Sequence, residues 1–173
     1  MILYHTSRSE IRNPDIRVGR KNADFGPGFY LTPDREFALR WARDGSVINK
    51  YEFDAAGLSV VRFSRSTEWF GYIFHNRRGT DTVSADVIDG PIANDTIFDT
   101  LGVISSGYLT PGDALKLLMI GPEYRQIALK TEKAASRLRW TGSERTGRPD
   151  PGALEVEQTA YIEEFAAILA EIG

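Results

Sequence analysis

The chain has 173 residues, of which 42% are apolar and 26% charged, a balance that is typical of one globular domain and excludes a disordered chain. The net charge of −3 provides no basic field that would attract nucleic acid or anionic lipid. The sequence contains no cysteine, which excludes a disulfide framework and a thiolate zinc site and favours a cytoplasmic protein.

Apolar runs and turn residues predict an irregular alternation of strands and helices. Strands are expected over residues 2–5, 47–53, 58–63, 85–88 and 126–130, and another strand ends at Leu31. Helices are expected over residues 67–78, through 97–101, from Thr110-Pro111 onward, and over 132–138 and 154–172. A further short helix follows Leu31, with Thr32 as its N-cap and Pro33 at its first position. No apolar run approaches the roughly 20 residues that a membrane-spanning helix needs, so we expect no membrane contact.

Composition divides the chain near Trp140. Residues 1–140 are expected to form the domain, and residues 141–153, with three glycines and two prolines among polar residues, predict a linker. Residues 154–173 predict an appended amphipathic helix. Its apolar stripe consists of Leu154, Tyr161, Phe165, Ile168 and Leu169. This stripe can be buried on the parent domain, on a second copy in a homodimer, or on a partner protein, and high effective concentration favours the parent domain.

Three residues are candidates for binding a flat ring. His5 ends the first strand, where side chains at the edge of a sheet often reach a cleft. Tyr30 lies on the strand after a Gly-x-Gly turn, and Trp41 follows eleven residues later on the next helix. Two aromatic side chains held in this way can sandwich a heteroaromatic ring. The alternative is that Tyr30 and Trp41 are core residues and that His5 makes only a structural hydrogen bond.

Three segments in this order resemble the signature segments of ADP-ribosyltransferases of the diphtheria-toxin and poly(ADP-ribose) polymerase branch. These segments are Leu3–Ser7, Asp24–Thr32 and Tyr124–Lys130. The chain is also similar to a bacterial family of uncharacterised domains. The segments shared with that family are Arg20–Gly26, Trp69 followed by Asn76-Arg77, and Gly90–Asp95. The resemblance covers roughly residues 2–140.

The resemblance implies an α+β, ADP-ribosyltransferase-like fold, in which two short antiparallel sheets with flanking helices form a cleft for NAD. It implies that His5 hydrogen-bonds the ribose on the nicotinamide side and that the backbone of Thr6 pairs with the carboxamide. Tyr30 and Trp41 would stack on the nicotinamide ring. Gln126 stands where the family has its catalytic Glu, so it would touch the ribose.

Two residues depart from the wider superfamily. Thr6 replaces a glycine, so its side chain crowds the approach while its backbone groups remain usable. Gln126 replaces a glutamate, and an amide holds a hydroxyl but offers no negative charge to a cationic ribosyl centre. Glu123 and Asp95 are candidates for the missing carboxylate, although Glu123 can equally be a solvated loop residue and Asp95 a helix cap.

Basic residues in the loop before the glycine turn are candidates for the NAD diphosphate, namely Arg20 and Lys21 together with Arg17. The alternative is a solvated basic loop. The acidic residues between 81 and 99 do not match the spacing of an EF-hand loop, so no metal is expected.

The function that the resemblance implies is NAD-dependent mono-ADP-ribosyl transfer to a macromolecular acceptor, of a bacterial toxin or effector type. The nicotinamide–ribose bond would break through a transition state like an oxocarbenium ion. Two alternatives stay open, an NAD-binding module without catalysis and an NAD glycohydrolase. The expected partners are NAD, the unknown acceptor and an antitoxin or immunity protein, and the chain would be a monomer or a homodimer through its C-terminal helix.

Overall fold

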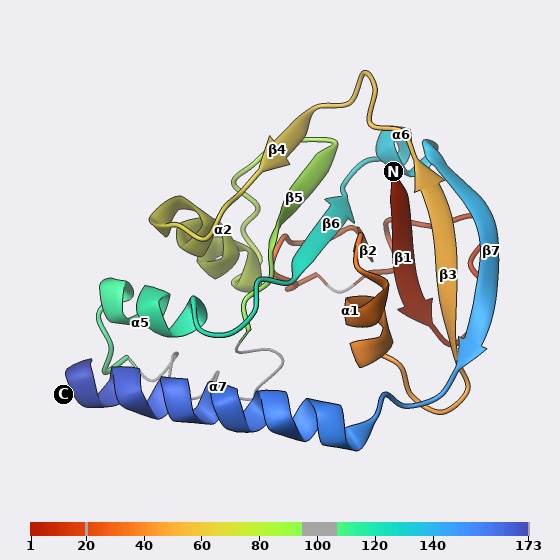
Figure 1. Ribbon diagram of the computed structural model, residues 1–173. Helices are drawn as coiled ribbons and strands as arrows, with labels where there is room; N and C mark the ends of the chain where they lie inside the picture. The colour runs from red at the N-terminus through yellow and green to blue at the C-terminus, as the bar shows by residue number, and fades with distance from the viewer. Residues whose placement is uncertain (20, 95–106, 173) are drawn as a thin grey trace.

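The computed structural model describes residues 1–19, 21–94 and 107–172, and this part of the chain forms two small β-sheets and five helices (Figure 1). The strands are β1 (Ile2–Ser7), β2 (Phe29–Leu31), β3 (Ser46–Phe53), β4 (Val60–Arg62), β5 (Val87–Pro91), β6 (Arg125–Leu129) and β7 (Leu138–Thr146). The helices are α1 (Arg35–Arg40), α2 (Thr67–Arg77), α5 (Pro111–Leu118), α6 (Glu132–Ala135) and α7 (Pro151–Ile172). The α+β class is confirmed.

One sheet is antiparallel and the other is mixed. The three-stranded sheet has the order β1-β3-β7, with both pairs antiparallel. The four-stranded sheet has the order β2-β6-β5-β4, and in it β4 runs parallel to β5. The expectation of two antiparallel sheets is therefore wrong for the second sheet. The physical reason is that helix α2 connects β4 to β5, and a crossover of this kind returns the chain in the same direction.

The two sheets meet where β1 and β2 lie side by side. Tyr4 and Thr32 form a bridge there, with the Tyr4 N–H donating to the Thr32 carbonyl at 2.8 Å and the Thr32 N–H donating back at 2.9 Å. These two bonds fix the relative placement of the strand ends that carry His5 and Tyr30.

The four-stranded sheet has a core on each of its two faces. Successive side chains of a strand point to opposite sides, so neighbouring residues of β2 enter different cores. Phe29 and Leu31 face the three-stranded sheet, where they join Leu3 and Tyr51 in one core. Tyr30 faces the other way and packs against a second core. This second core is formed by Phe25, Phe63, Trp69, Tyr72, Ile73, Ile88, Ala93, Leu118 and Ala128, and helix α2 covers it.

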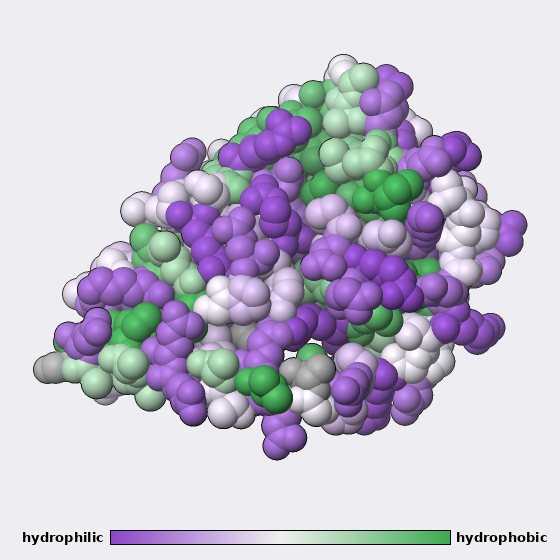
Figure 2. All heavy atoms as spheres, in the orientation of Figure 1, coloured by the Kyte–Doolittle hydropathy of each residue, from purple (hydrophilic) through white to green (hydrophobic). Residues whose placement is uncertain are grey.

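The C-terminal helix packs on its own chain. Tyr161 and Phe165 of α7 are buried against Leu117 and Ile120, in and just after α5. Along α7 the surface shows only small hydrophobic areas separated by hydrophilic ones (Figure 2), although Val156 is exposed. Intramolecular packing, the default expectation, is thus the arrangement found. No helix in residues 1–19, 21–94 or 107–172 combines the length and apolarity that crossing a bilayer requires.

The predicted linker begins too early. Strand β7 continues to Thr146 and pairs with β3, so the connection to α7 spans only residues 147–150. The strand is polar because it lies at the edge of its sheet and is mostly half-exposed or exposed. A register shift between Lys50 and Tyr51 leaves Thr141 without a cross-strand partner, and this bulge also weakens the alternating pattern.

The predicted start of α1 is also wrong. Its N-cap is Asp34, whose side chain accepts hydrogen bonds from the N–H groups of Glu36 and Phe37. Thr32 cannot take this place because its backbone belongs to the bridge with Tyr4. The helix expected through 97–101 lies outside the described residues.

Candidate functional site

A cavity of about 1450 Å³ lies beside the junction of the two sheets. Five of the residues expected to bind NAD line it, namely His5, Thr6, Tyr30, Trp41 and Gln126. The wall continues along α2 and α5 with Phe70, Phe74, Arg77, Pro111 and Ala114. Pockets for small molecules commonly measure about 300–1000 Å³, so this cavity has room for an extended ligand.

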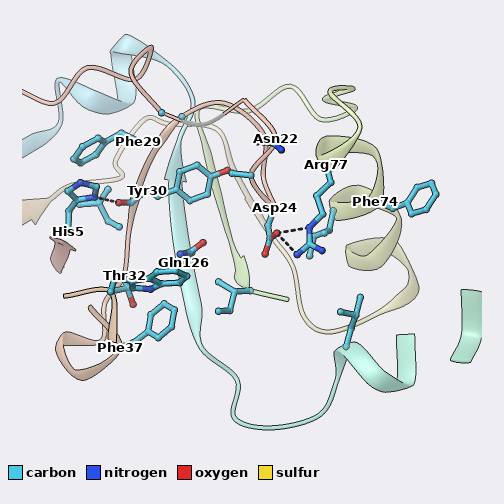
Figure 3. Close-up of a pocket in the computed structure, with 18 of the residues that line it drawn as sticks. His5, Asn22, Asp24, Phe29, Tyr30, Thr32, Phe37, Phe74, Arg77 and Gln126 are labelled. Carbon is cyan, nitrogen blue, oxygen red and sulfur yellow. Dashed lines mark hydrogen bonds and ion pairs between the residues drawn. The ribbon is translucent and has the colours of Figure 1, made fainter. Parts of the chain in front are cut away.

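His5 is held by the backbone of β2. Its Nδ1 lies 2.6 Å from the carbonyl oxygen of Tyr30, and its ring packs on Phe29 with 4.4 Å between ring centroids (Figure 3). Burial lowers the pKa of His5, against a smaller opposing effect of the hydrogen bond to Tyr30, so the ring favours its neutral form. A neutral ring that donates from Nδ1 keeps Nε2 as an acceptor, which suits a hydroxyl donor.

Thr6 directs its hydroxyl to helix α1. Its hydroxyl donates to the carbonyl of Ala38 in α1 at 2.5 Å. The backbone N–H and C=O of a strand alternate between its two edges, and those of Tyr4 point to β2. The N–H and C=O of Thr6, two residues further along, therefore point to the same edge. Threonine at this position leaves the backbone pair available to a carboxamide.

Tyr30 has its hydroxyl fixed by the glycine turn. The hydroxyl donates to the carbonyl of Gly26 at 2.5 Å and accepts from the N–H of Phe25 at 3.1 Å. Burial raises the pKa of Tyr30, and the negative charge of Asp24 raises it further, so the phenol is neutral. The ring is a rigid wall of the cavity whose hydroxyl is already engaged.

Trp41 is not a core residue. It caps the C-terminal end of α1, remains 39% exposed and meets Phe37 edge-on, with 6.1 Å between ring centroids. A half-exposed indole at the mouth of a cavity offers a stacking surface to a planar ligand.

Gln126 shares a face of the four-stranded sheet with Tyr30. Ala128 pairs with Tyr30 across β2 and β6, and Gln126 lies two residues before Ala128, so both side chains point to the same side. In the described part of the chain the Gln126 amide makes no side-chain hydrogen bond, although it is half-buried. In the view of Figure 3 it lies between Tyr30 and Phe37. Its amide is therefore available to a ligand.

An ion pair that the sequence did not reveal closes the other side of the cavity. Arg77 donates from Nη2 at 2.8 Å and from Nε at 3.0 Å to one oxygen of Asp24, and the other oxygen accepts from the N–H of Ala93 at 3.0 Å (Figure 3). Both side chains line the cavity. Gly26 approaches Asn76, the residue before Arg77, so closely that a Cβ at Gly26 would stand 2.5 Å from the Asn76 Oδ1.

The sequence contained one indication of this network, namely the three segments that the chain shares with the bacterial family. Arg20–Gly26, Asn76-Arg77 and Gly90–Asp95 are far apart in sequence, yet their described residues meet at Asp24, Arg77 and Ala93. Trp69, from the same set, donates from Nε1 to the carbonyl of Pro91 at 2.8 Å.

Several candidates do not line the cavity or lie outside the described residues. Glu123 does not line it, and its carboxylate pairs with Arg125 at 3.1 Å. Lys21 is exposed and does not line it either. Arg17, which the sequence grouped with Lys21, pairs with Asp15 at 2.8 Å. Arg20 and Asp95 lie outside the described residues.

The acidic residues between 81 and 94 pair separately with different cations. Asp81 pairs with Lys130, Asp86 with Lys133 and Asp89 with Arg125. Over residues 1–19, 21–94 and 107–172 no three carboxylate or imidazole groups are placed to hold a metal ion.

The fold and the cavity define an α+β domain with a ligand-sized cavity at the junction of two small sheets. The chain belongs to the family described as protein of unknown function DUF3990, whose model matches residues 1–140. That match ends inside β7 and does not include α7. No curated protein matches the chain.

Proposed function

We propose that the cavity binds NAD and that the protein is a mono-ADP-ribosyltransferase that breaks the nicotinamide–ribose bond. One observation carries this proposal: His5, Thr6, Tyr30, Trp41 and Gln126 line one cavity. These residues come from two sheets and the end of a helix and are up to 121 positions apart in the sequence, so chance does not readily place all five around one cavity.

The geometry supports a distinct role for each group. The free acceptor nitrogen of neutral His5 suits a ribose hydroxyl, and the edge of β1 at Thr6 offers a donor and an acceptor to the carboxamide. Tyr30 and Trp41 provide aromatic surfaces for the nicotinamide ring, and the amide of Gln126 suits a second hydroxyl. The protein would act by orienting and straining the dinucleotide, with ADP-ribose passing to a macromolecular acceptor in a cytoplasmic setting.

A second candidate is an NAD-binding module without turnover, and the carboxylates of the cavity favour it. In the described part of the wall these are Asp15, which is paired with Arg17, and Asp24, which is paired with Arg77. Neither is free to stabilise a ribosyl cation as the family's glutamate would, and Gln126 carries no charge.

Incubation of the protein with NAD labelled on the adenylate separates these candidates. Label on a macromolecule supports transfer, free nicotinamide without label supports hydrolysis, and saturable binding without nicotinamide release supports the binding module. Absence of NAD binding by calorimetry would overturn the proposal.

Gln126→Glu tests the assigned position. The substitution puts a negative charge beside the ribose, so we expect nicotinamide release to rise by about tenfold or more, as for other groups aimed at developing charge. Glu123→Gln is the matched control, since it removes a carboxylate outside the cavity, and it should leave release unchanged. A folded, NAD-binding Gln126→Glu protein with no gain would contradict the role of Gln126.

A further inference from the structure

Helix α7 touches the rest of the protein at a second place, at Glu157, one helical turn before Tyr161 and its apolar contact with α5. Glu157 accepts a hydrogen bond from the hydroxyl of Tyr124 at 2.6 Å and forms an ion pair with Arg40. The guanidinium of Arg40 in turn lies over the ring of Tyr124, 4.7 Å from its centroid. One carboxylate of α7 thus holds two side chains that come from different parts of the domain.

Both side chains stand next to residues of the NAD site. Arg40 ends α1 and is followed directly by Trp41. Tyr124 precedes Gln126 by two residues, and its ring stacks on Phe37 of α1 with 4.5 Å between centroids and 11° between planes. The backbone of Tyr124 is fixed as well, since its carbonyl accepts from the N–H of Ile92 at 2.9 Å. The Glu157 contacts therefore tie α1 to a fixed point at the start of β6.

The setting of this cluster makes it stronger than an ordinary surface ion pair. The side chains of Arg40 and Glu157 are only 18% and 22% exposed, whereas those of Arg148 and Asp44 in a surface pair are 70% and 79% exposed. Solvent screens a half-buried pair less, and the hydrogen bond from Tyr124 satisfies the same carboxylate.

We propose that Glu157 is a positioning residue for the NAD site, through which α7 sets the orientation of α1 and of Trp41 at the mouth of the cavity. The inference rests on the proposed function for its ligand. It adds to the site a residue that lies outside residues 1–140, the part matched by the family model. Glu157 does not line the cavity and acts only through Arg40 and Tyr124.

The substitution Glu157→Gln tests this without removing the helix. Glutamine keeps the size of the side chain and an acceptor for Tyr124 but loses the charge that pairs with Arg40. Tyr161 and Phe165 remain to hold α7 on α5. Glu163→Gln, at an exposed position of the same helix, is the charge-matched control. Tyr124→Phe is a second variant, which removes only the hydroxyl and keeps the ring on Phe37.

The first measurement is ¹⁹F NMR of the full chain with 5-fluorotryptophan, in which Trp41→Phe assigns the Trp41 signal. We expect Glu157→Gln and Tyr124→Phe to shift or broaden this signal and to leave the signal of the buried Trp69 in place. Glu163→Gln should change neither. An unchanged Trp41 signal in both cluster variants would overturn the inference, and so would an equal change in Glu163→Gln.

The second measurement is NAD affinity in a double-mutant cycle. Glu157→Gln should weaken binding by about three- to tenfold in the wild-type background and by much less in Trp41→Ala, because it acts through Trp41. Additive losses would contradict positioning and indicate a general loss of structure. Failure of the wild type to bind NAD, together with a Trp41 signal that moves only in the cluster variants, would refute the proposed function and uphold the control of Trp41 by Glu157.

Discussion

Two walls of the cavity, the one formed by strands and the one formed by α1, are held in different ways. The wall formed by β1, β2 and β6 is fixed by backbone hydrogen bonds, including the Tyr4–Thr32 bridge and the strand pairs around Gln126. The wall formed by α1 is fixed by side chains. Thr6 binds the carbonyl of Ala38, Phe37 stacks on Tyr124, and Arg40 pairs with Glu157.

The comparison shows where single substitutions should act on the site. Every residue except proline can make the backbone hydrogen bonds of the strand wall, so that wall should tolerate side-chain changes that leave the sheets intact. The helical wall depends on three side-chain contacts, so its geometry should respond to one substitution at a time. The predictions below test this difference, from the largest expected effect to the smallest.

Ending the chain after Gly147 keeps β7 whole and removes α7. This loses the burial of Tyr161 and Phe165, and a buried large apolar side chain contributes about 1.5–3 kcal/mol, so the free energy of unfolding should fall by about 3–6 kcal/mol. Urea denaturation measures the change. Ile162→Ser, at an exposed position of α7, is the control and should cost little. Unchanged stability of the shortened chain would indicate that α7 serves mainly a second copy or a partner.

Asp24→Asn tests the ion pair that closes the cavity opposite His5. Asparagine keeps the shape of the side chain but loses the charge that accepts two bonds from Arg77. Charge-assisted hydrogen bonds contribute about 1.5–3 kcal/mol, and we expect a loss of stability in this range. Thermal unfolding of the Asp24→Asn variant measures this loss of stability. Asp15→Asn is the control, because the pair of Asp15 with Arg17 is exposed. Equal losses in the two variants would show that the Asp24 pair has no special importance.

Trp41→Ala tests the helical wall directly. Stacking of aromatic rings is worth about 0.5–1.5 kcal/mol beyond burial, so NAD affinity should fall by about 2- to 10-fold while the strand wall stays intact. Calorimetric titration with NAD gives the affinity. Trp41→Phe keeps an aromatic ring and should restore most of it. If the Trp41→Ala and Trp41→Phe variants bind NAD equally well, residue 41 makes no stacking contact with the ligand.

His5, on the strand wall, should make the free energy of unfolding depend modestly on pH. Its pKa in the folded protein lies below the ordinary value of 6.5, so below about pH 6.5 the unfolded chain binds a proton that the folded protein does not. Stability should therefore fall as the pH drops from 6.5 toward the folded pKa. Urea unfolding of the wild type and of His5→Gln between pH 8 and pH 5 isolates the effect. The difference between the two should change across this range, and a constant difference would contradict the burial of a neutral imidazole.

The elements that the sequence predicted are those with a strong local pattern. The apolar residues of β1 and α2 and the proline at the start of α5 specify their elements within a few residues. Gln126 and Tyr30 were placed on strands by similar runs, and the order of the segments predicted that they would share a cavity.

The features that the sequence did not predict depend on distant partners. Asp24 and Arg77 are 53 positions apart in the sequence, and nothing local to either residue indicates that the two will pair. Strand β7 is recognisable only once β3 is beside it, because its own residues are polar and its glycine at 142 suggests a loop. Glu123 looked suitable by its distance from Gln126 in the sequence, but Arg125 engages its carboxylate outside the cavity.

Helix α5 joins two hydrophobic clusters through adjacent residues. Leu117 belongs to the cluster with α7, and Leu118 belongs to the core beneath α2. A local opening that frees α7 therefore loosens one side of α5 while the other side still holds it against the sheet. Amide hydrogens of α7 should then exchange with solvent through this partial opening, whereas those of α5 and β6 should exchange only when the domain unfolds as a whole.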